Sequence, residues 1–81
     1  MDAVIIAVES VAPAREVLRD HRGIVIGVLE TQRLTGKLIA RDASGIVVGT
    51  YDPRSNQTRD SHGRVVGRGN LLGALLRLES R

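Results

Sequence analysis

A nine-residue pattern, R-D-x-x-G-x-V-[IV]-G, occurs three times in this chain. The copies begin at Arg19, Arg41 and Arg59, and their aspartates are separated by 22 and then 18 residues. Five of the nine places hold the same residue type in all three copies. A period of this length indicates a repeat architecture, in which one unit cannot bury its apolar surface alone. The sequence therefore predicts three copies of one short supersecondary unit.

Each copy contains the residue types of a β-hairpin turn. The aspartate side chain can accept a hydrogen bond from a backbone N–H two residues further on, and the first glycine can adopt the left-handed conformation that such a turn requires. The residues after this glycine are mostly β-branched, which favours a strand over a helix. We expect these turns to be formed by Asp20, Gly23, Asp42, Gly45, Asp60 and Gly63.

The second glycine of each copy lies inside the outgoing strand, at Gly27, Gly49 and Gly67. A glycine within a strand often marks a β-bulge, a kink or a close approach of another part of the chain. We expect one of these three features at each position.

The first outgoing strand is apolar on both faces, because every residue from Ile24 to Leu29 is aliphatic or glycine. Simple alternation would place Val25 and Leu29 on one face, and Ile24, Ile26 and Val28 on the other. One sheet in a monomer cannot cover both faces. We therefore expect either a curled or flower-like array of hairpins, or association between chains, and we favour a homo-oligomer.

The repeat sets the expected order of elements. A strand is expected at Ala3–Val8, interrupted by Ser10–Ala14. Residues 14–20 fit either a short helix capped by Ser10 or an incoming strand in register with the other copies, and the repeat favours the strand. The expected fold is mainly β, as one domain over 1–81, with hairpins at about 16–30, 37–51 and 57–69.

The C-terminal region changes to a helical period, and we expect a short helix at about 71–79 with Asn70 as its N-cap. Its leucines need a surface to cover. That surface is either the domain's own sheet or a neighbouring subunit or partner protein, and the sequence leaves both open. The candidate interface residues are Leu71, Leu72, Leu75, Leu76 and Leu78.

Composition limits both the core and the compartment. The 81 residues include no cysteine and one aromatic residue, Tyr51, so the core must be aliphatic and no disulfide or thiolate metal site can form. Oligomerisation is the remaining stabiliser for such a small β protein. No apolar run is long enough to span a membrane, and the N-terminal run carries an acidic rather than a basic residue. We expect a cytoplasmic protein without membrane contacts.

Eleven of the twelve basic residues are arginines, and the net charge is +3. Arginines at equivalent repeat positions would lie at equivalent places in space, where guanidinium groups could bind phosphate or an acidic partner. Alternatively, each arginine pairs with a carboxylate of a neighbouring hairpin, which we favour. Nucleic acid is a possible ligand but not the favoured one, because aromatic side chains for base stacking are missing. The candidate anion-binding residues are Arg19, Arg41, Arg59, Arg64 and Arg68.

The sequence carries no pattern typical of an active site. His21 and His62 occupy variable positions at turn tips, so we expect solvated turn residues rather than bases or ligands. The repeat aspartates are expected to cap turns, and no metal-binding, nucleotide-binding or nucleophile motif is present. We expect no catalytic residue, no cofactor and no metal, and hence no enzyme.

The repeat, followed in the second copy by Thr50-Tyr51-Asp52, resembles the short hairpin units of the four-fold β-flower type of small bacterial proteins. This resemblance covers about residues 16–69 and implies D-x-x-G hairpins arranged about a pseudo-symmetry axis, without an established activity. The stretch from Arg59 to Val65 is also similar to the Rhs, or YD, repeats of secreted toxins, with arginine in place of the tyrosine. The function expected is a structural or protein-interaction module.

Overall fold

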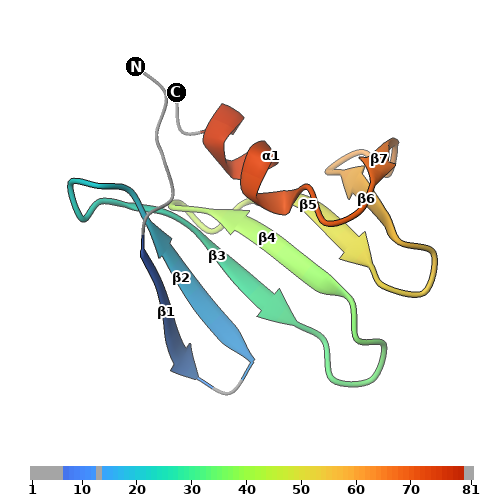
Figure 1. Ribbon diagram of the computed structural model, residues 1–81, viewed down its shortest axis with the longest axis horizontal. Coiled ribbons are helices and arrows are strands. Elements are labelled where there is room, and N and C mark those ends of the chain that lie inside the picture. Colours follow the sequence, from blue (N-terminus) through green and yellow to red (C-terminus); the bar gives the residue numbers. More distant parts are fainter. Residues whose placement is uncertain (1–6, 13, 80–81) are drawn as a thin grey trace.

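The computed structural model describes residues 7–12 and 14–79. These residues form seven strands followed by one helix (Figure 1). The elements are β1 (Ala7–Ala12), β2 (Arg15–Arg19), β3 (Val25–Thr31), β4 (Leu38–Asp42), β5 (Val47–Asp52), β6 (Gln57–Asp60), β7 (Val65–Arg68) and α1 (Leu72–Glu79).

The strands form one antiparallel sheet in sequence order, from β1 at one edge to β7 at the other. Each strand pairs with the strand before it and the strand after it, and no connection crosses the sheet. The turns that follow β2, β4 and β6 therefore share one end of the sheet. The fold is mainly β with a single short C-terminal helix, as the sequence predicted.

The N-terminal part of the sheet confirms one expectation and corrects another. Residues 15–19 form a strand, which confirms the strand interpretation and excludes the helix there. The expected interruption at Ser10–Ala14 is wrong for its first half, because β1 continues to Ala12 and pairs with Arg15 through a register shift. Residues 1–6, which include most of the expected strand Ala3–Val8, lie outside the described residues.

A register shift occurs at the same place in the pairs β2–β3, β4–β5 and β6–β7. In the first pair Leu18 faces Gly27 and Arg19 faces Val25, so Ile26 is an extra residue in the outgoing strand. Such an extra residue is a β-bulge. The bulge expected at the second glycine of each copy is thus present, with Ile26, Val48 and Val66 as the extra residues.

The bulge overturns the simple alternation expected for β3. Ile26 is buried in the core and Leu29 packs against that core, so these two residues share a face. Val25 faces Arg19, the neighbour of the buried Leu18, and therefore lies on the opposite face. Alternation failed because one unpaired residue shifts the side-chain phase by one position.

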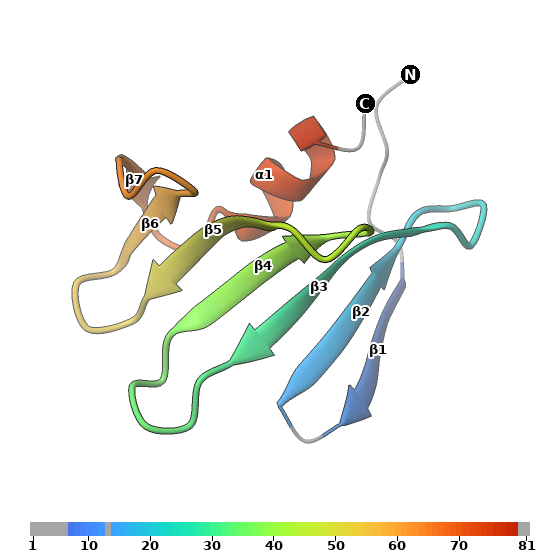
Figure 2. The same ribbon diagram turned by 180° about the vertical axis from the view of Figure 1, so that it is seen from behind.

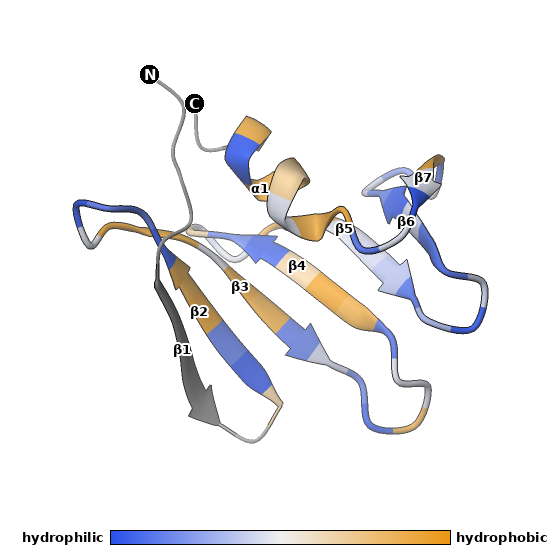
Figure 3. Ribbon diagram, in the orientation of Figure 1, coloured by the Kyte–Doolittle hydropathy of each residue, from blue (hydrophilic) through white to orange (hydrophobic). Residues whose placement is uncertain are grey.

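Helix α1 lies across β3, β4 and β5 on one face of the sheet (Figures 1 and 2). Hydrophobic residues follow β3, β4 and α1, whereas the β6–β7 hairpin is mainly hydrophilic (Figure 3). The buried hydrophobic residues between the helix and the sheet are Leu18, Ile26, Ala40, Val48, Leu72 and Leu76.

The second glycine of each repeat is where the C-terminal segment approaches the sheet. A Cβ atom on Gly27 would lie 2.5 Å from Leu76 Cδ2, and one on Gly49 would lie 2.6 Å from Leu75 Cδ1. At Gly67 the corresponding atom is Leu71 Cδ1, at 2.8 Å. The absence of a Cβ atom at these three glycines therefore leaves room for leucine side chains to pack against the sheet. Close approach and bulge occur together at each of them.

Candidate functional site

The three turns after β2, β4 and β6 have the same hydrogen bonds. In each turn one carboxylate oxygen of the aspartate accepts the N–H groups of the second and fourth following residues, at 2.9 and 3.0 Å. The first glycine donates its N–H to the aspartate C=O at 2.9–3.0 Å. Its φ is positive, at 80° to 90°, a conformation that glycine adopts without strain. Each turn is closed by backbone and side chain together.

These hydrogen bonds affect the ionisation of two of the three aspartates. Burial raises the pKa of Asp20, but the N–H groups of Ile24 and Arg22 and nearby positive charge outweigh it, so the pKa lies below the ordinary 3.8. The N–H of Arg64 is the largest cause of the lowered pKa of Asp60, and the N–H of His62 adds to it. Both carboxylates are therefore held in the charged form by the turn itself.

The repeat arginines also occupy equivalent places, but each is engaged with its own turn. Arg19, Arg41 and Arg59 each donate from Nη1 to the C=O of the first glycine of their copy, at 3.0, 3.0 and 2.8 Å. Arg41 donates in addition from Nε to Glu30, on the neighbouring hairpin. The alternative of pairing with a neighbouring hairpin thus holds for Arg41. The glycine carbonyl was not foreseen as a partner.

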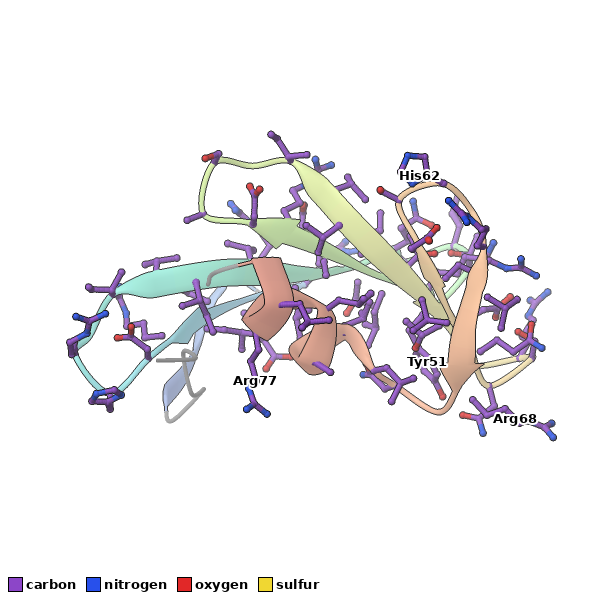
Figure 4. The ribbon with its side chains drawn as sticks, turned by 90° about the horizontal axis from the view of Figure 1, so that it is seen from above. Tyr51, His62, Arg68 and Arg77 are labelled. Atoms are coloured by element: carbon purple, nitrogen blue, oxygen red, sulfur yellow. The ribbon has the colours of Figure 1, made fainter. Side chains whose placement is uncertain are left out.

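The third hairpin carries the other two candidate arginines. The Nε atom of Arg64 lies 3.9 Å from Oδ2 of Asp60, and 80% of the Arg64 side chain is exposed. Arg68 is exposed at the end of β7, and its side chain points outward in Figure 4. Arg59, on β6, is exposed as well. Three of the five candidate arginines are therefore exposed on this one hairpin.

The candidate interface leucines have different surroundings. Leu72 and Leu76 are fully buried between α1 and the sheet, and Leu75 packs against the same core. Leu71 is half-buried beside Gly67. Leu78 alone among the five is exposed, at 59%. The helix thus covers the chain's own sheet, the first of the two alternatives.

The face of the sheet opposite α1 is not covered by another described helix or strand (Figure 2). Directly paired residues in an antiparallel sheet share a face, so the register identifies the side chains on this face. We define the open face by its half-buried aliphatic residues, which are Val17, Val25, Val28, Ile39 and Val47.

Charged residues are interspersed among these aliphatic side chains. Glu30 faces Ile39, Arg41 faces Val28 and Val47, and Arg19 faces Val25. The open face therefore combines aliphatic rows with the Arg41–Glu30 pair, a mixture typical of protein–protein contacts rather than of a domain core.

The two histidines lie at exposed turn tips, as expected. The ring Nδ1 of His62 is 3.5 Å from the hydroxyl of Ser61. Among the described residues, no group of three or more His, Asp or Glu side chains is placed to hold a metal ion.

Thr58 is a structural residue that the sequence reasoning missed. Its hydroxyl donates to Gly69 C=O at 2.7 Å and accepts the N–H of Leu71 at 2.9 Å, and the residue is fully buried. It therefore joins β6 to the segment that leads into α1. The signal was available, because Thr58 occupies the repeat position of the apolar residues Leu18 and Ala40.

Comparisons with protein-family models, with curated proteins and with solved structures found no match for this chain. Within the described part of the chain, the one helix is too short to span a bilayer.

Proposed function

We propose that this protein is a non-enzymatic interaction module that assembles as a homo-oligomer through the open face of its sheet. The observation that carries this proposal is the asymmetry of the sheet, which has α1 on one face and no described element on the other. Removing the aliphatic side chains of an uncovered sheet face from water lowers the free energy, so such a face favours association with another surface.

The mixed charge of the open face supports a second copy as the occupant. A two-fold contact needs only one self-complementary patch. The Arg41–Glu30 pair offers such a patch, because it carries both signs of charge.

The small core supports the same proposal. Six hydrophobic residues are buried among the described residues, and none of them is aromatic. Domains of this size bury a smaller fraction of their surface than larger ones, so association supplies burial that the single chain lacks. The C-terminal leucines contribute less than the sequence suggested, since Leu78 is the one that remains exposed.

The three hairpins are best understood as repeats of one unit, as in the β-flower resemblance. The support is their shared hydrogen bonds and bulges, which recur at equivalent residues. A curled or flower-like array of hairpins was the alternative to association between chains, and the described strands instead follow one another in one open sheet.

A charge placed on the open face tests the proposal. The Ile39→Lys variant puts an ammonium group at the centre of the aliphatic rows, where burial without a partner is unfavourable. We expect the mass measured by light scattering to fall from that of an oligomer to the 8.7 kDa of one chain. The circular dichroism spectrum should stay that of the wild type.

Leu34→Lys is the matched control, because Leu34 is 98% exposed in the turn between β3 and β4. It makes the same chemical change away from the open face and should leave the oligomeric mass unchanged. An Ile39→Lys variant that folds and keeps the wild-type oligomeric mass would exclude the open face as the interface.

Polyanion binding is the second candidate function, supported by the exposed Arg59, Arg64 and Arg68 of the third hairpin and by the net charge of +3. Binding of this kind weakens steeply as salt is added, because condensed counterions are released from the nucleic acid. Retention of random-sequence DNA at low salt, lost at physiological salt, is the expected result. No retention at low salt would exclude this candidate.

A further inference from the structure

Strand β7 is an outer strand of the sheet and is paired on one side only. Its partner is β6, and no described strand lies on its other side. An unpaired strand edge presents a row of backbone N–H and C=O groups to solvent, which can accept another strand. Edge strands are protected from such pairing by a covering element, a short length, a β-bulge or charged side chains. Strand β7 has four residues, the bulge residue Val66 and the exposed Arg68, which together disfavour pairing with a strand of like charge. Among the described elements, none covers this edge.

The side chains of β7 are also accessible. Val65 and Val66 are exposed by 47% and 45%, and Arg68 is exposed at the end of the strand. A strand added beside β7 would therefore find backbone hydrogen bonds, two valine side chains and a guanidinium group on one short edge. Main-chain hydrogen bonds give affinity in such additions, and alternate side chains give selectivity.

The charge around β7 is predominantly positive. Arg54, Arg59, Arg64 and Arg68 are all exposed on this hairpin and on the turn that precedes it. The acidic residue within the hairpin is Asp60, whose carboxylate already accepts two backbone N–H groups. Carboxylates on an added strand would therefore meet arginines rather than acids.

This charge distribution argues against a second copy at the same edge. Antiparallel pairing of two β7 strands would bring Arg64 and Arg68 of both copies along one short ladder, and like charges across strands are destabilising. The same charge would attract nucleic acid, whose phosphates could contact the arginines. However, nucleic acid has no strand to pair with the exposed backbone edge, and an acidic peptide uses both features.

We propose that the outer edge of β7 binds an extended acidic peptide segment by strand addition, with Arg64 and Arg68 contacting its carboxylates. The register places Val65 and Arg68 on the same face of the sheet as Ile39, but the backbone groups that would pair with the peptide lie at the outer edge of β7, so this binding does not require self-association. The Ile39→Lys variant should bind the peptide as the wild type does.

The probe is a fluorescein-labelled peptide of alternating glutamate and valine, and binding is followed by fluorescence anisotropy at low and physiological salt. Two further probes test whether charge alone, or nucleic acid, accounts for the binding. The first has the same sequence with alternate backbone nitrogens methylated, which removes strand pairing but keeps the charge. The second is single-stranded DNA of random sequence. We expect the unmodified peptide to bind and the methylated peptide to bind far more weakly.

Arg68→Glu and Arg33→Glu form the matched pair of variants. Both reverse an exposed arginine, but Arg33 lies in the turn between β3 and β4. The first should weaken peptide binding by about fivefold to tenfold, while the second leaves it unchanged. Hydrogen exchange at the β7 amides should slow when the peptide is bound.

Three outcomes would overturn the proposal. The first is an absence of peptide binding at low salt. The second is equal binding of the methylated peptide or of DNA, which would assign the arginines to plain polyanion binding. The third is equal loss of affinity in the Arg68→Glu and Arg33→Glu variants, which would indicate attraction to the overall charge rather than to this edge.

Discussion

At the scale of single residues, each copy of the repeat forms the same hydrogen bonds. The aspartate closes each turn with two N–H contacts, the first glycine takes a positive φ, and the arginine caps that glycine's carbonyl. The aspartate and glycine roles could be predicted from the sequence, because turn chemistry is local. The arginine role could not, since a long side chain has several partners within reach.

The turn aspartates make stability depend on pH in the acid range. Asp20 and Asp60 have pKa values below the ordinary 3.8 in the folded chain. Their contribution is therefore complete above that value and is lost as pH falls through the folded pKa. Below pH 3.8 the free energy of unfolding, measured with urea, should fall more steeply in the wild type than in the Asp60→Asn variant.

Asparagine keeps the accepting oxygen without the titrating carboxyl, so the turn itself should persist. If the free energy of unfolding falls equally with pH below 3.8 in the wild type and the Asp60→Asn variant, this carboxylate does not stabilise the fold through its charge.

The second glycines differ in what an added methyl group would meet. A Cβ at Gly49 would lie 2.7 Å from the backbone carbonyl of Arg59, whereas at Gly67 it would meet only the end of the Leu71 side chain. Gly49→Ala should therefore lower the free energy of unfolding by about 1–3 kcal/mol, the usual cost of overpacking, and Gly67→Ala by less. Urea denaturation of the two variants provides the comparison, and equal losses would contradict the account.

At the scale of elements, strands and helix could be predicted from period and turn signals, but their faces could not. The bulge residue Ile26 moves the following side chains by one position, so Val28 rather than Leu29 faces away from the helix. A glycine in a strand indicates a bulge without fixing which neighbour is the extra residue. The docking of α1 on Gly27 and Gly49 likewise depends on contacts distant in sequence.

Thr58 connects two elements and gives a second test of the helix's position. Thr58→Val keeps the shape of the side chain but leaves Leu71 N–H and Gly69 C=O without their partner. We expect a loss of about 1–3 kcal/mol in the free energy of unfolding, the penalty for a buried unsatisfied group. Thr58→Ser keeps the hydroxyl and should lose less. A valine variant as stable as the serine variant would show that these hydrogen bonds contribute little.

At the scale of the whole molecule, the sheet has one covered and one open face. The sequence predicted an excess of aliphatic surface, and the open face of Val17, Val25, Val28, Ile39 and Val47 is where the described structure leaves it. The sequence could not identify which leucines remain free, because that depends on where α1 packs. Self-association through the open face is the proposal that links these observations to function.

Sedimentation equilibrium of the unmodified chain over a range of concentrations tests this proposal most directly. At high concentration the mass should be a whole multiple of 8.7 kDa, at least twofold, and on dilution it should fall toward 8.7 kDa. A mass of one chain at every concentration would contradict the proposal, because the open face would then remain in water without a partner.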